Sequence, residues 1–150
     1  MIRAVVDANV WVSAFLKPES VPGQVVTAWA GHEFDAHVAA VTIVEVARAL
    51  TRPKLAAKYR VSWPEVIRFV GDLVAGATVH HVADPPRRCR DRTDDVLLEL
   101  GVRLAPCHLV TGDADLVKDD KLAPTMAASG LTIMMPAGFL GVLKLAQPAP

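Results

Sequence analysis

The chain of 150 residues carries 16 basic and 16 acidic side chains, so its formal net charge is zero, and 52% of its residues are hydrophobic. This length and composition predict one globular domain over residues 1–150 and argue against disorder. The balance of charge excludes attraction of nucleic acid by a global field, so any such affinity must come from local clusters of basic residues.

Short apolar runs alternate with stretches of helical periodicity along the chain. Helices are predicted over residues 41–50, from Ser62 to about Val74, from Asp94 onward and from Pro136 to about Ala146. This alternation is typical of a three-layer α/β/α fold, in which helices cover both faces of a central, mostly parallel sheet of about five strands. The runs that predict these strands are residues 2–6, 35–39, 79–82, 107–111 and 131–135.

The longest uncharged stretch, residues 122–143, has the length of a membrane span, but prolines and glycines interrupt it. A strand and a helix are predicted there instead. The amino terminus lacks the pattern of a secretory signal, so we expect a cytoplasmic protein with no membrane partner. The two cysteines, Cys89 and Cys107, accompany no cluster of metal ligands, which argues against a disulfide framework and a structural zinc site.

Four acidic residues fall where predicted strands end or on predicted helices. Asp7 and Asp113 each follow a strand, and if these strands are parallel neighbours, the two carboxylates meet at the edge where open α/β sheets bind ligands. Glu45 and Asp94 would join them if their helices pack above the same edge. Crowded carboxylates repel one another unless a cation lies between them, and oxygen ligands of this kind suit Mg²⁺ or Mn²⁺.

Each of these acidic residues also has a plain structural interpretation. Asp94 and Asp95 are favourable residues at the start of a helix, whatever else they do. Glu45 has Arg48 three residues further on and could be its solvent-facing partner. The acidic residues after the two strands could be ordinary turn or loop residues.

The order and spacing of four short segments resemble the PIN domain family. The segments Arg52–Leu55 and Pro136–Leu140 are similar to its branch of toxins from toxin–antitoxin systems, the VapC-like proteins. The resemblance covers nearly the whole chain. It departs at Ala8, where the family commonly has threonine, and the missing hydroxyl removes one possible contact near the site. The four segments are Val5–Val10, Val44–Val46, Cys89–Asp95 and Leu109–Leu116.

The resemblance implies a metal-dependent ribonuclease that uses Mg²⁺ or Mn²⁺, that is held inactive by a cognate antitoxin and that forms a homodimer. Asp95 and Asp115 are neighbours that could replace a metal ligand or act through water. The spacing of the segment from Asp91 to Asp94 favours Asp94 over Asp95 as the third ligand, and leaves the choice open. The catalytic and metal-site carboxylates that the resemblance assigns are Asp7, Glu45, Asp94 and Asp113.

The same resemblance suggests that Asn9 and Thr111 orient the ligands or the substrate. Among the basic residues, Arg48, Arg52 and Lys54 are candidates to contact the RNA backbone, because phosphate contacts supply affinity without sequence information. A solvated surface is the plain alternative for these three residues.

Two other functions compete with the ribonuclease. One is a phosphatase or phosphotransferase with Asp7 as nucleophile, since a carboxylate can form an aspartyl-phosphate. Against it, Asn9 stands two positions on in place of an acid, and no lysine follows the strand near Asp113. The other is a catalytically inactive PIN-like module that binds RNA or protein, and the presence of all four acidic positions argues against it.

Overall fold

The computed structural model describes residues 1–149, and its five strands form one sheet in the order β3-β2-β1-β4-β5. All four neighbouring pairs of strands are parallel. The predicted α/β fold with about five strands is therefore confirmed. The strands are β1 (Arg3–Val6), β2 (Asp35–Ala39), β3 (Thr78–His80), β4 (Cys107–Val110) and β5 (Leu131–Met134).

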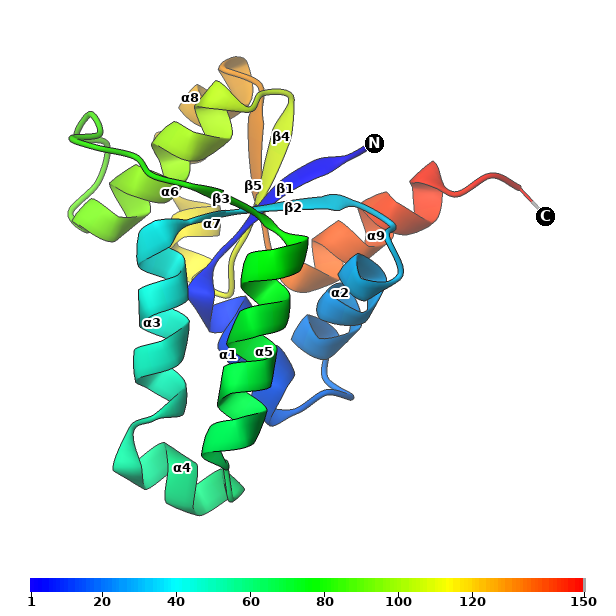
Figure 1. Cartoon of the computed structure of the whole chain (residues 1–150). Helices are drawn as coiled ribbons and strands as arrows, with labels where there is room; N and C mark the ends of the chain where they lie inside the picture. Colours follow the sequence, from blue (N-terminus) through cyan, green and yellow to red (C-terminus); the bar gives the residue numbers. More distant parts are fainter. Residues whose placement is uncertain (150) are drawn as a thin grey trace.

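Helices cover both faces of this sheet, as predicted (Figure 1). One hydrophobic core is formed with α1, α2, α3, α5 and α9, and a second core lies on the opposite face with α6, α7 and α8. The helices are α1 (Ala8–Leu16), α2 (Val21–Ala30), α3 (Ala40–Leu50), α4 (Pro53–Tyr59), α5 (Trp63–Gly76), α6 (Arg92–Arg103), α7 (Ala114–Lys118), α8 (Leu122–Ala128) and α9 (Pro136–Ala146).

The central strand β1 is buried on both sides. Val5 and Val6 have no exposed surface, and because successive side chains of a strand point to opposite faces, Val5 belongs to one core and Val6 to the other. Trp11 on α1 packs against this strand, and its indole N–H donates to the carbonyl of Val6 at 3.1 Å. These contacts fix the direction in which the chain leaves β1.

The connections from β1 and β4 leave the sheet on opposite faces. The chain passes from β1 to β2 through α1 and α2, whose core residues lie on one face. From β4 to β5 it passes through α7 and α8, which pack on the other face. In open α/β sheets, such a reversal between neighbouring strands opens a crevice beyond their carboxyl ends. The register of the two strands places Val6 beside Val110, so β1 and β4 end side by side at this edge of the sheet.

The structure corrects two predictions about helices. Helix α6 begins at Arg92 rather than at Asp94, because the side chain of Asp91 accepts the backbone N–H of Thr93 at 2.8 Å and caps the helix. The uncharged stretch 122–143 contains the helix α8 in addition to the predicted strand and helix. This helix buries Leu122 and Met126 in the second core.

The structure confirms three of the predicted helices. Helices α3, α5 and α9 occupy the predicted segments, with α5 continuing to Gly76. Both cysteines are free. Among residues 1–149, no helix has both the length and the apolar character needed to cross a membrane.

Candidate functional site

The four carboxylates that the sequence singled out lie within electrostatic range of one another near the carboxyl ends of β1 and β4, where this topology is expected to open a crevice. Burial raises the pKa of Asp7, and the charge of Asp113 raises it further. Burial likewise raises the pKa of Glu45, with a further contribution from the charge of Asp7. The pKa of Asp94 rises to about 6 through burial and the charges of nearby carboxylates, which include Asp7, Asp113 and Glu45. The four groups therefore share one electrostatic environment.

Asp7 is the most firmly held of the four. It follows β1 directly, only 8% of its surface is exposed, and it caps helix α1. Its Oδ1 accepts the backbone N–H of Ala8 at 2.7 Å, and its Oδ2 accepts the hydroxyl of Thr111 at 2.8 Å. These hydrogen bonds lower the pKa of Asp7 but do not outweigh burial. The carboxylate is fixed in position and is short of compensating positive charge.

Asn9 and Thr111 connect the loops that follow β1 and β4. The amide nitrogen of Asn9 donates to Oδ2 of Asp7 at 3.3 Å, and its amide oxygen accepts the backbone N–H of Gly112 at 2.9 Å. Thr111 is fully buried, and its hydroxyl also accepts the backbone N–H of Asp113 at 3.1 Å. Both side chains thus orient Asp7 and the segment that carries Asp113.

Asp95 does not join the four carboxylates, although it is the neighbour of Asp94. It has no exposed surface, and its Oδ1 accepts the backbone N–H groups of Arg88 at 2.8 Å and of Cys89 at 3.0 Å. Its Oδ2 accepts the guanidinium of Arg92 at 3.0 Å. Burial alone would raise the pKa of Asp95, but these hydrogen bonds outweigh it and lower the pKa. Asp95 therefore anchors the loop before α6.

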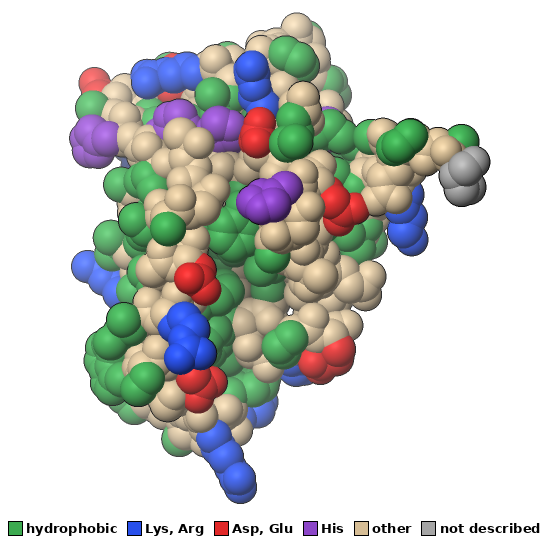
Figure 2. Space-filling model, turned by 45° about the vertical axis from the view of Figure 1, so that its right-hand side comes forward, with side chains coloured by type: hydrophobic (Ala, Val, Ile, Leu, Met, Phe, Trp, Pro, Cys, Tyr) green, Lys and Arg blue, Asp and Glu red, His purple; other side chains and the backbone are tan. Residues whose placement is uncertain are grey.

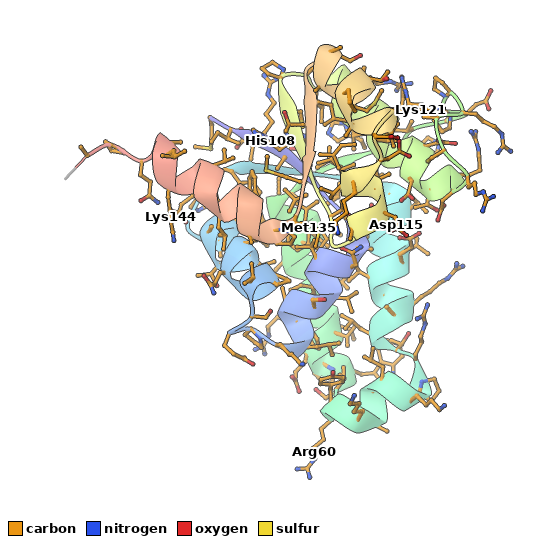
Figure 3. All side chains as sticks on the ribbon, turned by 180° about the vertical axis from the view of Figure 1, so that it is seen from behind. Arg60, His108, Asp115, Lys121, Met135 and Lys144 are labelled. Atoms are coloured by element: carbon orange, nitrogen blue, oxygen red, sulfur yellow. The ribbon has the colours of Figure 1, made fainter. Side chains whose placement is uncertain are left out.

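Two further acidic residues lie near the site. Asp115 is exposed on α7, at the end of the sheet where Met135 follows β5 (Figure 3). Asp91, the cap of α6, contributes to the raised pKa values of Asp7, Glu45 and Asp94. Asp91 was not among the site residues predicted from the sequence. Its position three residues before Asp94, about one helical turn, is the signal that predicts a shared face.

Glu45 is not paired with Arg48, and the basic residues predicted to contact RNA lie outside the group of carboxylates. Among residues 1–149, no ion pair joins Glu45 to Arg48. Glu45 instead faces Thr93 at the start of α6, whose side chain offsets part of the rise that burial causes in the pKa of Glu45. Arg48, Arg52 and Lys54 are exposed at the end of α3 and the start of α4, so they lie beyond the carboxylates rather than among them.

The donor set fits a hard divalent cation by its chemistry. The charged groups that act on Asp94 are all carboxylates, and oxygen ligands are those that Mg²⁺ and Mn²⁺ prefer. Within residues 1–149, no three His, Cys, Asp or Glu side chains stand in an arrangement that could hold a metal ion. Burial is the largest cause of these raised pKa values, and the mutual repulsion that adds to it is what a bound cation would relieve.

The fold and the site define an α/β domain with an acidic cluster at the carboxyl edge of a parallel sheet. The sequence profile of the PIN domain matches residues 3–115, and the chain belongs to the PIN domain family. PIN domains are commonly nucleases and generally use divalent metals. The finer resemblance to the VapC-like branch remains a prediction.

Comparison with solved structures supports the fold. A PilT N-terminus domain protein from the hyperthermophilic archaeon Sulfolobus solfataricus P2 is similar over 99% of this chain and 98% of its own, with a TM-score of 0.51 and 12% sequence identity. At this level of identity, the likeness concerns the fold alone. No curated protein sequence matches the chain.

The raised pKa of Asp94 predicts how stability depends on pH when no metal is present. A carboxyl that binds its proton more tightly in the folded state adds stability at low pH, and this contribution is lost as the pH rises through the folded pKa. For Asp94 the loss falls between the ordinary value of 3.8 and about 6. We therefore expect its contribution to the free energy of unfolding to decline over this range.

Urea denaturation in EDTA, at several pH values, measures this contribution in wild type and in Asp94→Asn. The difference between the two proteins isolates the carboxyl of Asp94, because the histidines and most other carboxyls titrate in both. Wild type should lose more stability than the variant as the pH rises to 6. A difference that does not change with pH would contradict the raised pKa.

Proposed function

We propose that this PIN domain is a metal-dependent endoribonuclease that hydrolyses RNA phosphodiester bonds. The observation that supports the proposal is electrostatic: Asp94 is influenced by the charges of Asp7, Glu45 and Asp113, and burial together with like charges raises the pKa of Asp7, Glu45 and Asp94. Such a site attracts a divalent cation and, through it, a phosphate.

The four carboxylates would hold Mg²⁺ or Mn²⁺. When bound, the ion lowers the pKa of a water molecule and stabilises the charge of the leaving oxygen. Asp95 has its oxygen atoms occupied by the loop before α6, which supports Asp94 as the third ligand. Asp115 is exposed on α7 and remains a candidate to act through water.

The chain's own residues supply position and charge. Thr111 and Asn9 hold the carboxylate of Asp7, so its orientation does not have to be established when the ligand arrives. A site that is oriented beforehand loses less entropy on binding and reaction. Arg48, Arg52 and Lys54 are proposed to contact phosphates of the RNA on the side of α3.

The biological setting is a further part of the proposal. The VapC-like resemblance supports a toxin of a toxin–antitoxin pair, acting as a homodimer in the cytoplasm. Copurification of the chain with a small protein encoded beside it would support the antitoxin, and its consistent absence would leave a freestanding nuclease. Light scattering that gives the mass of a monomer at working concentration would remove the homodimer.

Cleavage of a panel of structured and unstructured RNAs tests the nuclease directly. We expect the wild-type protein to cut with Mg²⁺ or Mn²⁺ and to stop when EDTA is added, whereas Asp113→Asn should cut poorly under all conditions. RNA binding without cleavage by the wild type would favour the inactive module. A phosphorylated Asp7, trapped after incubation with a phosphate ester, would favour the phosphatase.

A further inference from the structure

A cluster of positive charge lies at the far end of α3 from the acidic crevice. The chain turns there from α3 through α4 into α5, and we call residues 48–63 the elbow. Figure 3 shows Arg60 at the tip of this turn, pointing away from the body of the molecule. The elbow contains five basic residues and no acidic residue, in a chain whose net charge is zero. The five are Arg48, Arg52, Lys54, Lys58 and Arg60.

These five cations are exposed and are not neutralised by neighbours. Among residues 1–149, the side-chain ion pairs involve Arg88, Arg92 and Arg103, all on or beside α6, and none involves the elbow. An ordinary solvated surface mixes both signs of charge, and unpaired like charges destabilise the compact state by self-repulsion. Helix α4 contains no buried residue, but Leu50 at the end of α3 is fully buried, and Leu55 and Val61 pack against the core. These apolar residues hold the elbow to the core, while its basic side chains are exposed. A polyanion would supply the missing negative charge.

An aromatic ring lies beside this charge. Trp63, the first residue of α5, is 67% exposed, although it is among the largest apolar side chains. It lines a small surface depression of about 60 Å³ with Thr51 and Ala56, which places the ring against the end of α3 and against α4. Figure 2 shows hydrophobic side chains exposed beside the lower end of the molecule, where basic side chains also project. Exposed aromatic rings next to basic residues form the stacking platforms of proteins that bind single strands.

The elbow and the crevice can be reached by one extended ligand. Glu45, Arg48 and Arg52 are spaced by three and four residues, which places the first two on one face of α3 and the third just beyond its end. At 1.5 Å per residue, Glu45 and Thr51 are separated by roughly 9 Å along the helix axis. A ligand in the crevice therefore needs to extend by only a short distance to reach the near end of the elbow, at Arg48 and Arg52.

We propose that the elbow, with Trp63 as a stacking platform, binds a single-stranded stretch of RNA outside the acidic crevice. The inference rests on the proposed function for the identity of the polyanion, and it deepens that function by naming a surface outside the crevice that binds it. Duplex RNA offers phosphates but keeps its bases stacked on one another, so it could use the cations and not the ring. The chemistry of the elbow therefore favours a single strand over a duplex.

Fluorescence anisotropy with a labelled oligouridine tests the proposal in EDTA, where no metal can contribute to binding. Lys58→Gln/Arg60→Gln should weaken binding and reduce the slope of log Kd against log salt by roughly 1.4, since each phosphate contact of a single strand accounts for about 0.7. Trp63→Ala should weaken binding about tenfold and leave the slope unchanged, because stacking releases no counterions.

A matched control removes two charges elsewhere. Lys121→Gln/Lys144→Gln changes two exposed lysines that Figure 3 shows away from Arg60, and it should bind as the wild type does. Tryptophan fluorescence gives an independent measure. Trp11 is fully buried and Trp29 packs against it, with ring centroids 5.0 Å apart, so Trp63 is the ring that bound RNA should reach. RNA should therefore quench the tryptophan fluorescence of the wild type but not that of Trp63→Phe.

Three results would overturn the inference: equal affinity for a duplex of the same length, elbow variants that bind as tightly as the lysine control, or tighter binding of polyglutamate than of RNA. The last would assign the elbow to an acidic protein partner. The nuclease is judged separately, by adding Mg²⁺ or Mn²⁺. Binding through the elbow without any cleavage would support the inference and contradict the proposed nuclease. Cleavage that no elbow variant alters would support the nuclease and contradict the inference.

Discussion

Replacing Asp7 by asparagine is expected to lower metal-dependent RNA cleavage by at least about 100-fold, since removing even a residue that supports a metal ligand typically costs 10- to 100-fold. Asparagine keeps the shape of the side chain and can still accept a hydrogen bond from the hydroxyl of Thr111, but it removes a charge from the centre of the proposed site. The measurement is the rate of cleavage of one RNA at saturating Mg²⁺ or Mn²⁺, for wild type and variant.

The loss of activity in Asp7→Asn should not come from unfolding. The raised pKa of Asp7 means that the folded state disfavours its charge, so removing this charge should leave the metal-free protein at least as stable as wild type. Asp120→Asn is a matched control, because Asp120 is an exposed residue in the turn before α8. Full activity in Asp7→Asn, or an equal loss in the control, would refute the role of Asp7.

Replacing Asp95 by alanine is expected to have the largest effect on stability, a loss of about 3 kcal/mol or more in the free energy of unfolding. The substitution removes the acceptor for the backbone N–H groups of Arg88 and Cys89 and leaves the guanidinium of Arg92 without its buried partner. The thiol of Cys89 also donates to Asp95 at 3.2 Å. Urea denaturation at pH 7 measures the change.

Asp94→Ala is the control for Asp95→Ala, since it removes the same side chain one position earlier. The raised pKa of Asp94 indicates that its charge is disfavoured in the folded, metal-free protein, so this variant should not lose comparable stability. It should instead lose cleavage. Equal losses of stability in the two variants would show that the neighbouring aspartates do not have the separate roles inferred here.

The sheet and the convergence of its acidic edge could be predicted from local patterns. Runs such as Ala4–Val6 are apolar without interruption because their strand is buried on both faces, and that pattern is visible in the sequence. Asp7 follows such a run directly and Asp113 follows one after Thr111 and Gly112, so parallel pairing alone places them at one edge. Whether these residues bind a metal remains a prediction.

The choice between Asp94 and Asp95 could not be made from the sequence. Both are acidic residues in the first turn of one helix, and only the packing of the loop before α6 distinguishes them. That loop depends on hydrogen bonds from the backbone of Arg88 and Cys89, which no side-chain pattern reveals. The helix α8 was missed for a related reason, because seven residues with two buried side chains give too little periodicity.

The order of the strands determines when the crevice can exist during synthesis of the chain. The hydrogen bond between Thr111 and Asp7 joins residues 104 positions apart, and β1 pairs with β4 only after most of the chain has been translated. Contacts between such distant residues form late, because the loop that they close is long. A nascent chain that has folded only its first half therefore lacks both Asp94 and Asp113. The ribosome that makes this protein is exposed to the complete acidic cluster only when synthesis is nearly finished.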